Sequence, residues 1–187
     1  MKKKSFVMVL ALVLVFAVAV GGVVAWLTDK TDPVKNTFTV GDINITLTES
    51  GTNDAGEKSY KMIPGSTLDK DPTVTVKAGS EDCYLFVKVE KSANFDKFLT
   101  YAMATGWEKV ADNVYARKVL ATDEVKSFSV LAGDKVTVKT DVTKGDLNAL
   151  TEATYPTLTF TAYAVQLHNG AETDWTAAQA WAANFGA

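Results

Sequence analysis

Short stretches in which apolar and polar residues alternate recur along most of the chain. A period of two residues is typical of β-strands that bury one face and expose the other. Turn-forming pairs such as Pro64-Gly65 and Gly133-Asp134 separate these stretches. The predicted strands lie in residues 37–47, 73–77, 83–91, 107–110, 114–118, 125–131, 136–140 and 157–166. Many short strands joined by frequent turns predict an all-β fold, a jelly-roll-like β-sandwich.

Two other stretches do not follow the period of two. Residues 94–104 fit the spacing of a helix as well as that of a buried strand, and both interpretations stay open. Residues 144–150 are long enough for one helical turn.

The strand predicted over residues 83–91 has the clearest alternation in the chain. One face carries Cys83 and three aliphatic residues, while Tyr84 and Phe86 lie on the other. Aromatic residues on that second face indicate that it is covered too, by a loop or by another subunit. Cys83 is the only cysteine, so the chain cannot form an intrachain disulfide. A lone thiol could be buried or could link two chains, and its place on the apolar face favours burial.

The period changes near the C-terminus, where residues 174–185 predict a short amphipathic helix. Its apolar stripe covers an arc of about 120°, which is the width of a face that packs on a core. Thr173 or Asp174 is the predicted N-cap, and Gly186 the predicted stop. The residues of the stripe are Trp175, Ala178, Trp181, Ala182 and Phe185.

The N-terminus has the pattern of an export signal. Three lysines follow Met1, residues 6–27 are apolar, and a V-x-A cleavage motif ends at Ala25. We therefore expect a signal peptide over residues 1–25, cut between Ala25 and Trp26. The alternative is a retained membrane anchor, since the apolar run is just long enough to span a bilayer. The predicted division then continues with an N-terminal segment over 26–40 and one β-sandwich domain with its helix over 41–187.

Charge and histidine content exclude several kinds of function. Cleavage removes three of the 19 basic residues and none of the 22 acidic ones, which leaves a net charge of −6. Such an acidic domain has no electrostatic footprint for nucleic acid. The only histidine, His168, lies in a predicted turn, and no H-E-x-x-H motif is present. The acidic pairs match no calcium-loop spacing. We predict no cofactor, no metal site and no catalytic residue.

The first half of the chain combines several motifs. The signal continues into Trp26-Leu27-Thr28-Asp29, and Asn36 to Ile43 reads N-T-F-T-V-G-D-I. Residues 64–71 follow a PG-x-x-L-x-KD pattern through Pro64, Gly65, Leu68, Lys70 and Asp71, and the strand around Tyr84 follows. Together these motifs resemble the TasA/camelysin family of Gram-positive surface and biofilm-matrix proteins. The resemblance covers mainly the residues up to Lys91.

The resemblance implies a secreted jelly-roll domain that polymerises head to tail into fibres of the extracellular matrix or cell surface. A SipW-type signal peptidase would remove the signal, so the chain would meet the membrane only while uncleaved. In family fibres the N-terminal segment is donated as a strand to the next subunit. Carried over to this chain, the donor strand lies within 26–40, and the candidate residues are Trp26, Leu27, Val34, Phe38 and Val40.

Three alternatives to the donated strand and the fibre remain. The segment could instead be the first strand of its own domain. Some camelysin-type members are classed as metalloproteases, but one histidine and no ligand motif give no reason to transfer that activity. A binding module that does not polymerise, for a glycan or a host surface, is the third alternative.

Overall fold

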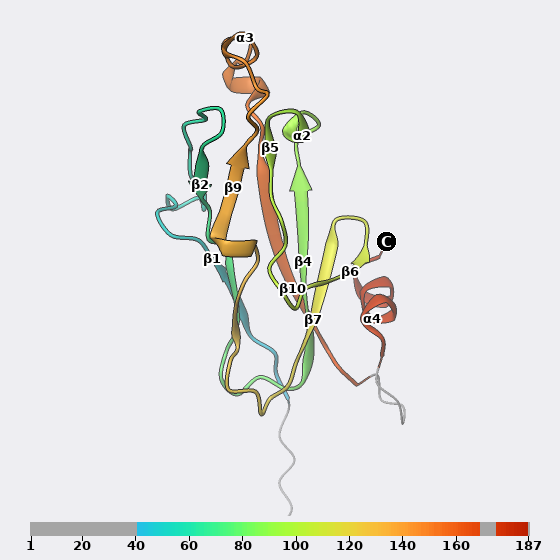
Figure 1. Cartoon of the computed structure of the whole chain (residues 1–187). Coiled ribbons are helices and arrows are strands. Elements are labelled where there is room, and N and C mark those ends of the chain that lie inside the picture. Colours follow the sequence, from blue (N-terminus) through green and yellow to red (C-terminus); the bar gives the residue numbers. More distant parts are fainter. Residues whose placement is uncertain (1–40, 169–174, 187) are drawn as a thin grey trace, which may run out of the picture. The chain divides into compact units, whose positions relative to one another are not determined.

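The computed structural model describes residues 41–168 and 175–186 of the 187-residue chain (Figure 1). The expected signal peptide and the segment 26–40 lie outside these residues. The elements in chain order are β1 (Ile45–Thr48), β2 (Thr67–Asp69), β3 (Thr73–Val76), β4 (Cys83–Lys91), α2 (Phe95–Phe98), β5 (Leu99–Thr100), β6 (Glu108–Ala111), β7 (Val114–Val119), β8 (Ser127–Ser129), η1 (Ala132–Asp134), β9 (Lys135–Val138), α3 (Lys144–Asn148), η2 (Glu152–Thr154), β10 (Leu158–Gln166) and α4 (Ala177–Asn184).

The described strands form three antiparallel sheets. Sheet A has the order β1-β3-β8, sheet B the order β2-β9-β5, and sheet C the order β10-β4-β7-β6. The predicted β-rich fold is confirmed, and so are the long strands β4 and β10, which pair along nine residues. The hairpin predicted around residue 113 is β6–β7, where Asn113 adopts a φ of 58°.

Sheets A and B continue into each other and form one layer. Between β2 and β3, Lys70 donates its N–H to the carbonyl of Asp134 at 2.8 Å, and the carbonyl of Pro72 accepts from the N–H of Val130 at 2.9 Å. The inner faces of this layer and of sheet C bury a common core. The largest fully buried side chains of this core are Leu85, Val87, Val89, Phe95, Leu131, Val74, Val119, Val130 and Val138.

The outer face of sheet C has its own apolar cluster, which is covered by α4 (Figure 1). Phe86 is fully buried there, and its ring centroid lies 5.3 Å from that of Trp181. The sequence led us to expect a loop or another subunit on this face. The element that covers it is instead the C-terminal helix, because the chain returns across sheet C after β10.

The boundaries and the stripe predicted for the C-terminal helix were partly wrong. The helix begins after Thr176, whose side chain accepts from the N–H of Gln179, while the Gln179 side chain accepts from the N–H of Thr176. This reciprocal capping box fixes the start of the helix. Ala180 and Trp181 are buried, whereas Ala178 and Ala182 are exposed. The packing of the Trp181 ring on Phe86 determines which face of the helix is buried.

The ambiguous residues 94–104 contain both predicted structures in succession, the helical turn α2 and then the short strand β5. The helical turn predicted within 144–150 is α3, which begins with a capping box between Thr143 and Asp146. Cys83 is fully buried on β4, as its place in the alternation predicted.

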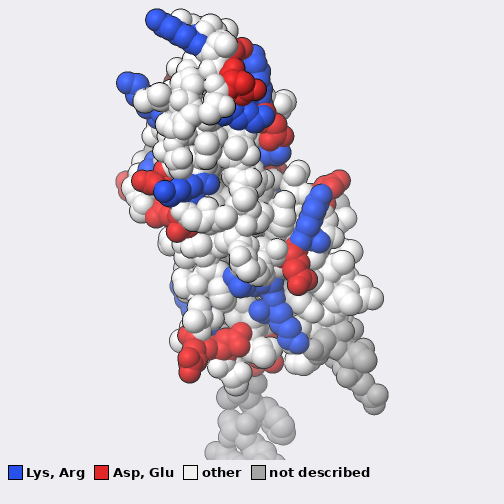
Figure 2. Space-filling model, in the orientation of Figure 1, with Lys and Arg blue, Asp and Glu red and all other residues white. Residues whose placement is uncertain are grey.

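Within the described part of the chain, no helix is long and apolar enough to cross a bilayer. On the face that Figure 2 shows, acidic and basic side chains are interspersed, with uncharged surface between them.

Candidate functional site

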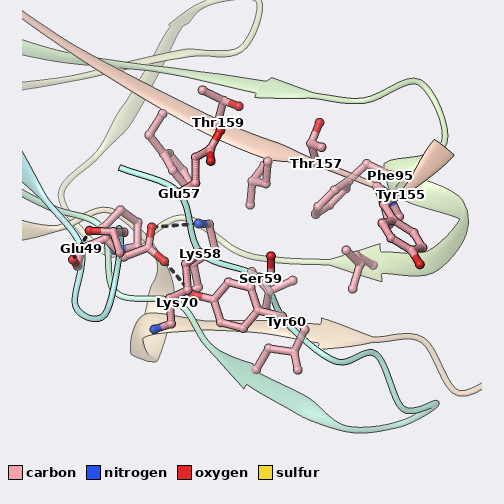
Figure 3. Close-up of a pocket in the computed structure, with 18 of the residues that line it drawn as sticks. Glu49, Glu57, Lys58, Ser59, Tyr60, Lys70, Phe95, Tyr155, Thr157 and Thr159 are labelled. Atoms are coloured by element: carbon pink, nitrogen blue, oxygen red, sulfur yellow. Dashed lines mark hydrogen bonds and ion pairs between the residues drawn. The ribbon is translucent and has the colours of Figure 1, made fainter. Parts of the chain in front are cut away.

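A large cavity of about 1260 Å³ opens between the start of β10 and the chain that links β1 to β2. Its walls come from three regions: the end of β1 with residues 49–62, the strand β2 and its neighbour β9, and residues 147–160. Figure 3 shows Glu49, Lys70 and Tyr60 at one side of the cavity and Phe95 and Tyr155 at the other. We call this cavity the groove.

β10 borders the groove with an edge that no described strand pairs. It is the outermost strand of sheet C and forms a ladder with β4 only. The carbonyl of Thr157 accepts from the N–H of Ser92, and the N–H of Leu167 donates to the carbonyl of Asp82. Odd-numbered residues therefore direct their backbone groups to β4, and even-numbered residues direct theirs to the open edge. These open-edge residues are Leu158, Phe160, Ala162, Ala164 and Gln166.

The floor of the groove is apolar. Leu158 and Phe160 of β10 contribute side chains that pack on the main core. Phe95 and Leu99 continue the floor from α2 and β5, and Leu68 reaches it from β2. An apolar floor beside an open strand edge is the arrangement that accepts an added strand, because the backbone pairs while alternate side chains fill pockets.

The chain from Lys58 to Met62 forms the wall opposite β10. Its side chains alternate, with Lys58, Tyr60 and Met62 half-buried and Ser59 and Lys61 exposed. This is the pattern of a strand, yet no backbone N–H or C=O of residues 58–62 bonds to any other described residue. We call these five residues the wall segment.

Side chains rather than backbone hold the wall segment in place. The hydroxyl of Tyr60 donates to Glu49 Oε1 at 2.6 Å, and Lys58 Nζ donates to the carbonyl of Ser50 at 2.9 Å. Lys70 Nζ lies 2.8 Å from Glu49 Oε2 and 5.4 Å from the centroid of the Phe160 ring. Burial, followed by the hydrogen bond to the Glu49 carboxylate, raises the pKa of Tyr60 above its ordinary value.

Two residues of the PG-x-x-L-x-KD pattern, Leu68 and Lys70, line this part of the groove. Ser66 donates its N–H to the carbonyl of Ile63, and Gly65 has a φ of 78°, which together define a type II turn with Pro64 at its first central position. Leu68 packs on the core, and Lys70 pairs with Glu49. Asp71 Oδ1 accepts from the N–H of Ser50 at 3.1 Å, and its hydrogen bonds with Ser50 hold the pKa of Asp71 below its ordinary value.

The structure therefore brings two of the predicted site residues, Leu68 and Lys70, to the groove, while Pro64, Gly65 and Asp71 do not line it. The others lie outside the described residues: Ala25, Trp26, Leu27, Val34, Phe38 and Val40. Sequence reasoning missed Glu49, Tyr60 and Phe160. Glu49 lies in a stretch that reads as a loop by composition, and Tyr60 follows it. The alternation of Tyr60 with Met62 is the signal by which a strand-like wall could have been predicted.

The other candidate functional residues do not come together in one site. Cys83 is fully buried, and burial raises the pKa of its thiol to about 11. His168 Nε2 lies 3.9 Å from Asp82 Oδ2 in an exposed position. Among residues 41–168 and 175–186, no three potential metal ligands come together.

Comparisons with family models, curated protein sequences and solved structures found no match to this chain.

Proposed function

We propose that this chain is a secreted structural protein that assembles head to tail, with residues 26–40 of one copy added as a strand in the groove of the next. The observation that carries the proposal is the open edge of β10 beside an apolar groove. The fold of such a subunit would be a jelly roll, as the resemblance to TasA/camelysin proteins implies.

The two ends of the described domain support a head-to-tail arrangement. Thr48 and Leu158 line the groove at one end of β1 and β10. At the other end, the carbonyl of Asp42 accepts from the N–H of Glu81, and Gln166 pairs with Cys83. The nine residues of β10 separate these ends by about 27 Å. The chain thus enters β1 at the end remote from the groove, and contacts of this kind repeat as an open filament.

The sequence of the segment 26–40 suits the groove. Pro33 lacks a backbone N–H, which restricts ladder pairing to the residues that follow it. From there Val34, Phe38 and Val40 share one parity and would share one face of a strand. We infer that Phe38 and Val40 fill the apolar floor while the backbone of the segment pairs with β10.

Export would precede assembly. Cleavage between Ala25 and Trp26 by a signal peptidase of the SipW type would release the segment from the membrane, and the fibres would form in the extracellular matrix or at the cell surface.

Electron microscopy of the secreted protein, with N-terminal sequencing of the same sample, tests the proposal. We expect filaments built from chains that begin at Trp26. Phe38→Asp should abolish the filaments because it places a charge on the apolar floor. Thr39→Asp adds the same charge one position away, on the other face of the strand, and should leave filaments intact.

A secreted chain that remains monomeric at high concentration would overturn the proposal. The segment of 15 residues spans up to about 50 Å when extended, so it also reaches the groove of its own subunit. A monomer with a protected β10 edge would identify that intramolecular arrangement. Equal loss of filaments in Phe38→Asp and Thr39→Asp would show that strand parity plays no part.

A further inference from the structure

We propose that the wall segment, residues 58–62, is a second acceptor strand, so that a strand from another copy of this chain pairs along both of its edges, with β10 and with the wall segment. This inference rests on the proposed function and specifies which backbone receives the incoming strand.

The wall segment has the burial pattern of a strand without the partners of one. Its side chains alternate between half-buried and exposed, and none of its backbone groups bonds within the described chain. Its two ends are fixed. Glu57 donates its N–H to Asn53 Oδ1 at 2.8 Å, and the carbonyl of Ile63 accepts from Ser66. A segment anchored at both ends and unpaired between them is prepared to form a ladder.

Both walls of the groove therefore present unpaired backbone groups. β10 offers those of Leu158 and Phe160, and the wall segment lines the same cavity. A strand in the middle of a sheet needs about 4.8 Å to each neighbour, so two acceptor walls about 10 Å apart would receive one strand. Pairing on two edges gives twice the main-chain hydrogen bonds of pairing on one, and it covers the apolar floor from water.

The side-chain anchors of the wall segment leave its backbone free for this pairing. Tyr60 is held through its hydroxyl to Glu49, and Lys58 through its Nζ to the carbonyl of Ser50. Lys70 secures Glu49 in turn. None of these contacts uses a peptide group of residues 58–62, so an incoming strand displaces no backbone hydrogen bond.

A second copy of this chain is the occupant that the molecule itself provides. Seven residues, 34–40, follow Pro33 and precede the first described residue, and their apolar positions share one parity. A strand of that length is long enough to pair with the part of β10 that lines the groove, which ends at Phe160. The segment is connected to the described domain at the end remote from the groove. This connection favours binding of the segment in the groove of a neighbouring copy.

Hydrogen exchange resolved to short peptides, on the secreted chain before and after assembly, tests the inference. We expect the amides of residues 58–62 to exchange about a hundredfold more slowly in the assembled protein, together with the amides of Leu158 and Phe160 in β10. The amides on the outer edge of β6 provide the control. β6 is the opposite edge of sheet C, away from the groove, and should not change.

The outcomes separate the inference from the proposed function. Protection of β10 with unchanged exchange in residues 58–62 would overturn the second acceptor strand and leave strand addition intact. Filaments in which neither wall gains protection would overturn both. Protection of the wall segment alone would also overturn the inference, because it requires both edges to pair.

Discussion

Lys70 and Glu49 form an ion pair of 2.8 Å whose side chains are only 14% and 12% exposed. The pair joins the end of β2 to the chain that leaves β1. The Glu49 carboxylate also accepts from Tyr60, so one buried acid holds both the strand layer and the wall segment of the groove. The geometry of the groove therefore depends on this pair.

Replacing Lys70 by methionine should lower the free energy of unfolding by about 2 kcal/mol. Methionine keeps much of the lysine volume, but the Glu49 carboxylate then stays largely buried without its cation, and a buried unpaired charge is costly. Urea unfolding followed by tryptophan fluorescence measures the change.

The double variant Lys70→Met with Glu49→Gln controls for the loss of the pair itself. Glutamine is uncharged, so the double variant leaves no buried charge without a partner. It should therefore lose less stability than the sum of the two single changes. Strict additivity would contradict the coupling that the structure indicates.

Tyr60→Phe should cost about 1 kcal/mol at neutral pH, because the Glu49 carboxylate loses one hydrogen bond. It should also change the pH dependence of stability. Since the pKa of Tyr60 is raised in the folded state, the folded chain retains a proton that the unfolded chain releases above pH of about 10. The stabilisation is complete below that pH and is lost as pH rises above it.

Urea unfolding at pH 9, 10 and 11 measures this slope. We expect a shallower decline in Tyr60→Phe than in the unchanged chain. Tyr101, whose pKa burial raises to about 12, is present in both chains and contributes equally. Equal slopes in the two chains would show that Tyr60 is not the group responsible.

The strands that bury one face could be predicted from the sequence, because alternation is a local signal. β4 and β10 match their predicted ranges closely, and Cys83 is buried where the alternation placed it. The groove could not be predicted from the sequence. It depends on which strand lies at the edge of sheet C, and strand order follows from pairing between residues distant in the chain. The Glu49–Lys70 pair is likewise a contact across 21 positions.

The phase of the C-terminal helix shows the limit of a local periodicity argument. Several alanines fit either of two neighbouring stripes, and the Thr176 capping box together with the docking of Trp181 on Phe86 selects one. The T-x-x-Q signature of that capping box is present in the sequence and gives the correct start of the helix.

Cys83 should react with a thiol reagent only when the domain opens. Its side chain is fully buried, and burial raises the pKa of the thiol to about 11, so little thiolate exists at pH 8. Labelling with a chromogenic disulfide at pH 8 should be slow in buffer and rapid in denaturing urea. Fast labelling of the folded chain would contradict the burial of Cys83 on β4.

Ala180→Glu should destabilise the domain by about 3 kcal/mol, because Ala180 is fully buried against sheet C and a glutamate there has no partner. Ala178→Glu is the matched control on the exposed face of the same helix and should change stability by no more than about 0.5 kcal/mol. Urea unfolding of the two variants compares them directly. A larger loss of stability in Ala178→Glu than in Ala180→Glu would show that Ala178 is buried, as periodicity alone predicted.

A chain with a defective donor segment and a chain with a blocked groove should assemble with each other into a dimer and no further. Phe38→Asp removes a functional donor segment but keeps the groove. Leu158→Pro should block strand addition, because Leu158 lines the groove and its N–H points to the open edge of β10, where a proline leaves the ladder with β4 intact. Thr159→Pro, whose N–H points to β4, is the control and should unfold the strand.

Each of the first two variants should remain monomeric alone, whereas their mixture should give dimers of one copy each in native mass spectrometry. The intact segment of the Leu158→Pro chain enters the groove of the Phe38→Asp chain, and that dimer has neither a second functional segment nor a second open groove. Filaments from Leu158→Pro alone would show that β10 is not the acceptor. A mixture that stays monomeric would indicate that the segment folds into its own subunit, since a head-to-tail contact requires only one good segment and one good groove.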